Sequence, residues 1–252
     1  MVVYLKNIFT DAGSITLFTS RFFAEVFRRP LEFGEFLRQC YIIGFKSLGL
    51  VGITAFIMGL VMTIQTRPTL VEFGAESWLP GMIALSLIKE IAPVITAVIC
   101  AGKVASAMGA ELGSMKVTEQ IDAMEVSGIN PYKYLVVTRV LATTFMIPIL
   151  VIFADAIGMF GSFVAMNIHS DITLFRFLTK AMASIEFVDI IPATIKTFFF
   201  GFFIGMIGCY KGYTASYGTE SVGKAANAAV VSASITIFVI DMLAVQITDI
   251  IF

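Results

Sequence analysis

The chain has 252 residues and a formal net charge of −1, with 58% hydrophobic and only 14% charged residues. Soluble domains typically contain ~45–50% apolar and ~25% charged residues. This composition excludes a disordered chain, and it excludes a soluble monomer because the charged residues are too few to cover its surface. A chain without a basic excess also has no field to attract nucleic acid. The composition therefore predicts an integral membrane protein with no nucleic-acid partner.

Five segments are long and apolar enough to cross a bilayer, which takes ~20 residues in a helix. They cover residues 47–66, 78–102, 140–170, 190–210 and 225–248. Continuous apolar runs such as residues 198–204 exclude the alternating pattern of a membrane β-barrel strand. The sequence therefore predicts an all-α integral membrane protein with five transmembrane helices.

The basic residues between these segments predict the orientation, because cytoplasmic connections carry an excess of Lys and Arg. One set of alternate connections holds Lys6, Arg21, Arg28, Arg29, Arg38, Lys46, Lys103, Lys116, Lys133, Arg139, Lys211 and Lys224. The opposite set holds Arg67, Arg176, Lys180 and Lys196. The N-terminus is therefore expected in the cytoplasm and the C-terminus on the outer side.

Residues 1–40 are expected to form an N-terminal interfacial helix, and residues 41–252 the transmembrane domain. No cleavable signal peptide is predicted, since an uninterrupted apolar core is missing. Large apolar residues recur at helical spacing beside arginines, which is typical of a helix lying in the membrane interface. These apolar residues are Phe18, Phe22, Phe23, Val26, Phe27 and Leu31. The alternatives are a loose tail and a helix packed on the other spans.

Two features resemble active-site motifs without predicting one. Residues 218–225 fit the first seven positions of a phosphate-binding P-loop, but Ala225 replaces the hydroxyl residue that coordinates magnesium. His169, the single histidine, has no cluster of cysteines or carboxylates around it in the sequence. The three cysteines lie far apart in apolar runs and predict no disulfide framework. We therefore predict no catalytic residue and no metal site.

Lys89 and Glu90 stand in the middle of the second predicted span. Ionisable groups at this depth are costly, so they usually face a cavity, a partner or a substrate path. Neighbouring residues of a helix diverge by about 100°, so these two cannot form an ideal pair with each other. Two hypotheses stay open: both line a cavity, or both form structural ion pairs, for example Lys89 with Asp155 or Asp241.

The stretch after the second span predicts a cytoplasmic amphipathic helix that can dock a soluble partner. Its apolar side is formed by Met108, Leu112, Met115 and Ile121, and its acidic side by Glu111, Glu119, Asp122 and Glu125. Residues 128–131, Gly-Ile-Asn-Pro, are a helix stop. Glycines at 201, 205, 208 and 212 of the fourth span, and at 158 and 161 of the third, predict close helix packing.

A family resemblance is carried by residues 84–94, 102–124, 212–218, 222–223 and 229–231. Together these segments resemble the MlaE (YrbE-type) permeases of lipid-transporting ABC systems. The resemblance covers roughly residues 40 to 252. Relatives often carry Arg where this chain has Lys89 and Lys103; lysine keeps the charge but lacks the planar fork of five donors.

The resemblance implies a homodimeric permease paired with a cytoplasmic ABC ATPase, an MCE-domain periplasmic protein and, in many systems, a small STAS-domain protein. It implies no cofactor in this chain, since the partner ATPase uses ATP and Mg. The expected activity is lipid transport, of phospholipids above all, between the inner and outer membranes, with the chain in the bacterial inner membrane. Lipid would bind in a cavity at Lys89 and Glu90. Coupling to the ATPase would use Lys103, Glu111, Leu112, Met115, Glu119 and Asp122.

Two alternatives come from other functional classes. An ion-coupled secondary transporter would use Lys89, Glu90, Asp155 and Asp241 as a proton relay, but such folds usually show internal repeats, and these five spans are unlike one another. The second alternative is a membrane-embedded enzyme or a membrane scaffold for an MCE protein. The few catalytic residue types argue against an enzyme, and a scaffold would show no ATP-dependent lipid movement.

Overall fold

The computed structural model describes residues 2–28, 32–168, 171–216 and 218–251, with side chains from residue 13 onward. The regular structure in these residues is helical, and five helices are long and apolar enough to cross a membrane. These spans are Phe33–Glu72, Glu76–Val117, Tyr132–Asn167, Phe187–Tyr213 and Thr219–Ile251. The predicted architecture of five membrane-length helices is confirmed.

Three spans are built from several helical segments that follow one another directly. Span one consists of α2 (Phe33–Cys40), η1 (Tyr41–Phe45) and α3 (Lys46–Glu72). Span two consists of η2 (Glu76–Trp78), α4 (Leu79–Ser86), η3 (Leu87–Ile91), α5 (Ala92–Cys100), η4 (Ala101–Ala105) and α6 (Ser106–Val117). Span three consists of η5 (Tyr132–Val137) and α8 (Thr138–Asn167), whereas spans four and five are the single helices α10 (Phe187–Tyr213) and α11 (Thr219–Ile251). Segments η1, η3, η4 and η5 are π-helical turns, which often mark functional positions in helices.

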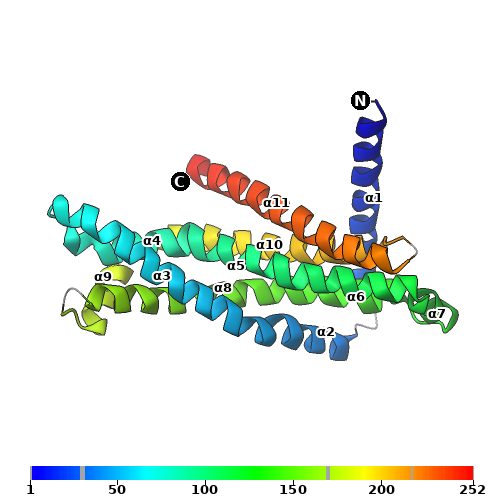
Figure 1. The fold of residues 1–252 in the computed structure, drawn as a ribbon, viewed down its shortest axis with the longest axis horizontal. Helices are drawn as coiled ribbons and strands as arrows, with labels where there is room; N and C mark the ends of the chain where they lie inside the picture. Colours follow the sequence, from blue (N-terminus) through cyan, green and yellow to red (C-terminus); the bar gives the residue numbers. More distant parts are fainter. Residues whose placement is uncertain (1, 29–31, 169–170, 217, 252) are drawn as a thin grey trace.

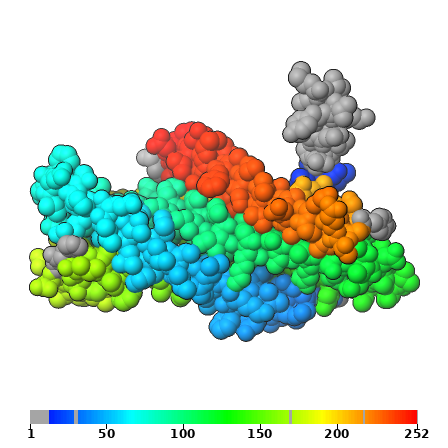
Figure 2. Space-filling model, in the orientation of Figure 1, coloured from blue at the N-terminus to red at the C-terminus, as the bar shows by residue number. Residues whose placement is uncertain are grey.

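The spans lie side by side along the long axis of the molecule (Figure 1). Span five is the exception, because α11 crosses obliquely and its C-terminal half diverges from the bundle. In the space-filling view of Figure 2, α11 lies across span two. Two short helices, α7 (Gln120–Val126) and α9 (Leu174–Ala183), sit at opposite ends of the bundle. The sequence analysis did not predict α9, which packs on α4 through the buried Phe177 and Ala181.

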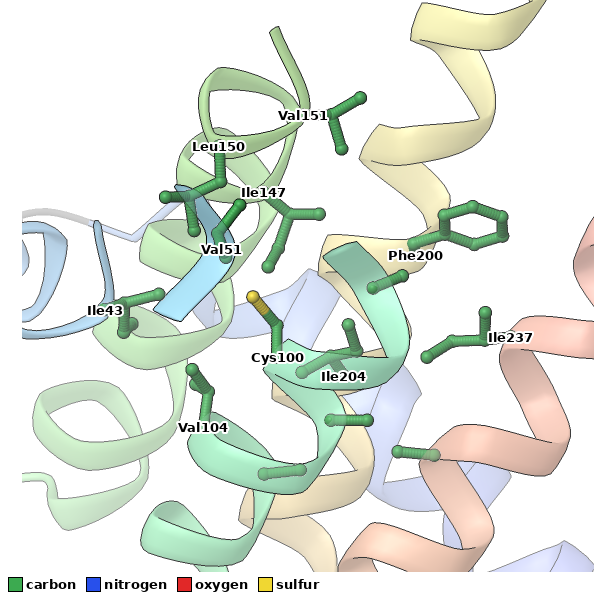
Figure 3. Packing of buried hydrophobic residues seen from close by; sticks show 14 of the residues in the cluster. Ile43, Val51, Cys100, Val104, Ile147, Leu150, Val151, Phe200, Ile204 and Ile237 are labelled. Atoms are coloured by element: carbon green, nitrogen blue, oxygen red, sulfur yellow. The ribbon is translucent and has the colours of Figure 1, made fainter. Parts of the chain in front are cut away.

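One apolar core joins all five spans, and Figure 3 shows part of it. Its labelled residues are Ile43 and Val51 from span one, Cys100 and Val104 from span two, Ile147, Leu150 and Val151 from span three, Phe200 and Ile204 from span four, and Ile237 from span five. Thr63 adds a polar contact to this packing, since its hydroxyl lies 2.7 Å from that of Ser162 on α8. Span five is the least buried of the five spans.

The predicted glycines lie where helix backbones approach each other. A Cβ atom added to Gly161 would lie 2.3 Å from the carbonyl oxygen of Phe56 on α3. Gly201 meets the backbone of Thr143 on α8 in the same way, at 2.5 Å from its oxygen. Gly212, one turn further along α10 than Gly208, faces α6 instead. The glycines of α10 therefore pack against two different spans in turn.

The segment 1–40 is two helices rather than the single helix predicted. The first is α1 (Val2–Val26), and the second, α2, is continuous with span one. Helix α1 stands at a steep angle to the bundle, at the end where α7 lies (Figure 1). It docks there through Phe18, whose ring is 4.9 Å from that of Tyr132, and through Phe22, which is buried. Phe27 is exposed, and the predicted contribution of Leu31 lies outside the described residues.

The predicted cytoplasmic amphipathic helix is not separate from span two. Helix α6 continues that span to Val117, and its apolar residues Met108 and Leu112 are buried against α10 and α11. The 42 residues of span two would reach about 63 Å at 1.5 Å per residue, twice the ~30 Å of a hydrocarbon core. The chain breaks only after α6, where Glu119 adopts a left-handed conformation with φ of 59°. The helix stop is where it was predicted, since α7 ends at Val126 and Gly128 has φ of 79°.

A matched pair of glycine variants tests the close packing of spans one and three. Gly161→Ala is expected to lower the unfolding free energy by about 1–3 kcal/mol, because the added methyl overlaps a backbone oxygen that cannot move alone. Gly49→Ala on α3 should have little effect, since no atom lies within 4 Å of its added Cβ. Unfolding curves of both variants in one detergent measure this, and an equal loss at the two positions would contradict the packing.

Candidate functional site: a charged cluster and cavity between spans two, four and five

Five ionisable side chains from three spans meet in one cluster. The ammonium nitrogen (Nζ) of Lys89 lies 2.9 Å from Oδ1 of Asp189. Nζ of Lys196 lies 2.7 Å from Oε2 of Glu90 and 2.9 Å from Oδ1 of Asp241. Lys89 and Glu90 belong to η3, Asp189 and Lys196 to α10, and Asp241 to α11. Two ammonium groups therefore face three carboxylates across spans two, four and five.

The local helix geometry explains this arrangement. Lys89 and Glu90 take different partners, as their predicted divergence requires. Asp189 and Lys196 are seven residues apart, close to two helical turns, so both project from the same face of α10. Asp189 also caps the start of α10, because its Oδ2 accepts a hydrogen bond of 3.1 Å from the backbone N–H of Glu186. The cap and the ion pair together fix the position of this carboxylate.

A cavity of about 330 Å³ adjoins this cluster. It lies between η3, the first turns of α10 and the diverging C-terminal half of α11, and we call it the charged cavity. Its lining residues are Lys89, Glu90, Val188, Asp189, Pro192, Ala193, Lys196, Ala244, Val245, Thr248 and Asp249. Its volume is within the range of small-molecule sites. Its lining combines ion-paired charges with apolar surface, as an amphiphilic ligand requires.

The two lysines differ in burial, which separates their roles. The Lys196 side chain is 5% exposed, so it is a buried charge shared between two carboxylates. The Lys89 side chain is 42% exposed, so its ammonium group remains accessible while it contacts Asp189. Lys89 and Glu90 thus lie in ion pairs and in a cavity wall at once. The two hypotheses drawn from the sequence are therefore not exclusive in this structure.

The predicted partners of Lys89 were wrong. Asp241 pairs with Lys196, and Asp155 on α8 lies apart from the cluster, with an Oδ1 atom that has no hydrogen-bond partner in the described structure. Sequence reasoning missed Asp189, because the predicted fourth span begins at residue 190 and leaves it in a loop. The seven-residue spacing from Asp189 to Lys196 is the signal that could have revealed it.

The predicted coupling residues lie at the far end of span two and differ in accessibility. Glu111 forms an ion pair, because its Oε1 lies 2.9 Å from Nη2 of Arg139, whose side chain is only 2% exposed. Leu112 is fully buried and Met115 is half-buried. Glu119 is exposed at the turn after α6. The α6–α7 turn therefore presents an exposed acid without an ion-pair partner in the described structure, whereas the exposed acid on α6, Glu111, is bound to Arg139.

The other two coupling residues make local contacts. Asp122 lies on α7, and its Oδ1 is 2.9 Å from Nζ of Lys116 on α6, so this pair closes the turn between the helices. Lys103 lies in η4, further back along span two, and its ammonium group donates to the backbone carbonyl of Lys46 on span one. Lys103 is thus separated from the α6–α7 turn by the length of α6.

The remaining sequence motifs form no recognisable site in the described part of the chain. No three His, Cys, Asp or Glu residues gather there in a way that could hold a metal ion, and His169 lies outside that part. In the P-loop-like segment, α11 begins already at Thr219, so most of the segment is helical. Lys224 in this segment pairs with Glu220 at 2.8 Å on the exposed surface.

These observations define a class: a multi-pass helical membrane protein with a charged, partly apolar cavity between its spans. Comparison with known proteins gives the family. Residues 36–247 match the family model described as Permease MlaE. A probable ABC transporter permease protein of Rickettsia felis is 36% identical over 91% of this chain and 88% of its own length. A probable ABC transporter permease protein of Synechocystis is 36% identical over 88% of this chain and 84% of its own.

A third relative is the chloroplastic protein TRIGALACTOSYLDIACYLGLYCEROL 1 of Arabidopsis thaliana. It is 31% identical over 90% of this chain and 65% of its own length. The chain therefore belongs to the MlaE permease family. It is the permease subunit of an ABC transporter, not itself an enzyme, and it works with an ATPase subunit.

The difference in burial between the two lysines predicts different costs for the same substitution. Lys196→Gln should lower the unfolding free energy by about 3–5 kcal/mol, because it leaves Glu90 and Asp241 without their cation. Lys89→Gln should cost about 0.2–1 kcal/mol, as expected for a solvated pair. Denaturation of both variants in one detergent measures the contrast.

A third variant separates charge pairing from packing. In the Lys196→Gln background, Glu90→Gln with Asp241→Asn should recover much of the lost stability, because no unpaired carboxylate remains. No recovery, or equal losses for Lys196→Gln and Lys89→Gln, would show that the ion pairs do not stabilise the bundle as described.

Proposed function

We propose that this permease transports phospholipid between the inner and outer membranes of a bacterium, as a homodimer in the inner membrane. One observation carries the proposal: the charged cavity joins an accessible ammonium group to apolar walls between membrane-spanning helices. A phospholipid has the matching chemistry, with an anionic phosphate and acyl chains. The Arabidopsis relative supports a lipid substrate, since that protein carries the name of a glycerolipid.

Lys89 is the group proposed to meet the phosphate. Its ammonium acts as a point charge and can hold a phosphate oxygen through a charge-assisted hydrogen bond. Asp189 competes for the same nitrogen, so an entering phosphate replaces a carboxylate rather than water. Glu90 remains bound to Lys196 and repels anionic groups from that side of the cavity. The acyl chains would contact the apolar residues Val188 and Val245.

Span two supplies the physical connection to the ATPase. The helix that carries Lys89 in η3 continues through η4 and α6 to Val117, and the accessible Glu119 follows directly. Coupling between distant sites is carried by rigid elements that have two arrangements. We propose that the ATPase, which uses ATP and Mg, docks at the α6–α7 turn and displaces span two. ATP hydrolysis would then favour a state with different lipid affinity, as any ligand-linked change requires.

The proposed orientation places α7 in the cytoplasm and α9 in the periplasm, with the N-terminus cytoplasmic and the C-terminus periplasmic. The excess of basic residues in the connections at the α7 end supports it. The steep angle of α1 is consistent with an interfacial helix, because a helix across the axis of the spans runs along the membrane surface (Figure 1). An MCE-domain protein would receive or deliver lipid at the periplasmic end. A small STAS-domain protein would bind the ATPase.

Lipid binding by Lys89 can be tested on the purified permease–ATPase complex. Lys89→Gln should reduce the phospholipid that co-purifies by several-fold, because the accessible cation of the charged cavity is lost, while unfolding changes little. Lys224→Gln removes the same charge from the exposed surface and serves as the control. Mass spectrometry of extracted lipid gives the readout, and unchanged lipid content in Lys89→Gln would refute this role.

Coupling through the α6–α7 turn can be tested by charge reversal. Glu119→Lys should weaken ATPase binding and lipid-stimulated ATP hydrolysis by about tenfold without unfolding the permease, because Glu119 is exposed and forms no ion pair in the described structure. Glu111→Lys is a poor probe, since it also leaves the buried Arg139 without its carboxylate. Glu72→Lys, exposed at the end of α3, is the control. Normal ATPase binding by Glu119→Lys would exclude the turn as the docking site.

A further inference from the structure

A second cavity system lies on the other side of η3 and α10, around the unpaired Asp155. A cavity of about 440 Å³ is lined by residues from η3, α8 and α9, and one of about 190 Å³ mainly by residues from α8 and α10, with single residues from η3, α5 and α9. Four residues line both cavities, namely Ile88, Ile152, Asp155 and Met182. The two cavities therefore adjoin, with Asp155 between them, and we call them together the Asp155 groove.

The Asp155 groove is distinct from the charged cavity. Ile88 lines the groove, whereas the next two residues of η3, Lys89 and Glu90, line the charged cavity. Ala193 of α10 lines both, so the wall of η3 and α10 separates two sites that lie back to back. An occupant of one site is thus not an extension of an occupant of the other.

The carboxyl group of Asp155 is a polar feature in otherwise apolar surroundings. Its Oδ1 is buried and has no hydrogen-bond partner in the described structure. A buried polar atom without a partner costs free energy, and an acidic residue inside a membrane span is costly as well. The groove's two threonines do not compensate, because the hydroxyls of Thr194 and Thr197 donate to carbonyls of their own helix. A ligand that donates a hydrogen bond would supply the missing partner.

The lining of the groove restricts the chemistry of that ligand. Neither cavity is lined by a Lys, Arg or His residue among the described side chains. A phosphate or carboxylate headgroup would therefore find no cation there. The other lining residues of the larger cavity are apolar, including Met159, Phe160 and Leu178, and suit a hydrocarbon body. The combined features match a lipid with an uncharged hydroxyl group and a hydrocarbon body.

We propose that the Asp155 groove binds a lipid alcohol, such as a diacylglycerol, whose hydroxyl donates to the Asp155 carboxyl group. The hydrocarbon body lies against α8 and α9, where Ile152, Leu178 and Met182 are exposed at the membrane-facing surface. This site does not depend on the transport role proposed for the charged cavity. It gives the permease two lipid sites of opposite preference, one for an anionic headgroup and one for a neutral hydroxyl.

Photolabelling of the full-length permease tests the proposal. The probe is dioleoylglycerol with a diazirine in one acyl chain, and the matched probes are phosphatidic acid and phosphatidylethanolamine with the same chain. Dioleoylglycerol should label residues 148–160 and 174–182 at least several-fold more than the other two. Asp155→Leu should reduce this labelling about five- to tenfold, whereas Asp155→Asn, which keeps a carbonyl acceptor, should retain most of it.

A second variant keeps the test informative if Asp155→Leu unfolds the protein. Met182→Trp fills the groove from an exposed position, so it should abolish labelling without unfolding the permease. If all three probes label the groove equally and Asp155→Leu leaves that labelling unchanged, the groove makes only ordinary lipid contacts. This outcome would overturn the proposal. Selective labelling by phosphatidylethanolamine would also overturn it, since the donor would then be an amine. Absence of labelling in both segments would overturn it as well.

Discussion

The buried ammonium group of Lys196 forms the interaction on which the half of the bundle nearer α9 depends. It lies within 2.9 Å of carboxylates from two other spans, Glu90 on η3 and Asp241 on α11. A charge in the membrane requires such compensation, so the three helices can approach only where these groups meet. Helix α11 packs on α6 and α10 through Ala225, Ala229, Ala233 and Ile237, and its C-terminal half diverges from the bundle (Figure 1). The ion pairs therefore hold the helix that forms one wall of the charged cavity.

The length of span two connects this cavity with the opposite end of the molecule. Because η3, α5, η4 and α6 follow one another directly, Lys89 and the α6–α7 turn belong to one helical element. Arg139 on α8 binds the α6 portion of that element through an ion pair with Glu111. The π-helical turns η3 and η4 interrupt the regular hydrogen-bond pattern and are natural points of bending. A movement of α6 therefore has a direct physical route to Lys89.

Much of the fold could be predicted from the sequence, because hydropathy and length alone define five membrane-spanning helices. The divergence of Lys89 and Glu90 follows from helix geometry and was also predictable. Their partners were not, since Asp189 is a hundred residues distant in the chain and only tertiary packing brings it to Lys89. The apolar pattern of α6 predicts a surface helix, because a leucine such as Leu112 gives the same pattern whether it faces a membrane or other helices. The structure shows that α6 packs on other helices, since Leu112 is buried against α10 and α11.

A photo-cross-linking amino acid placed on α11 gives the most direct test that the charged cavity is a lipid site controlled by the ATPase. Val245 lines the cavity, whereas Val231 is exposed on the part of α11 that lies outside its lining. Cross-linking of phospholipid at Val245 should change several-fold between the nucleotide-free and vanadate-trapped complexes, while cross-linking at Val231 should stay constant. Equal phospholipid cross-linking at Val245 in both states would contradict a lipid site whose affinity depends on the ATPase.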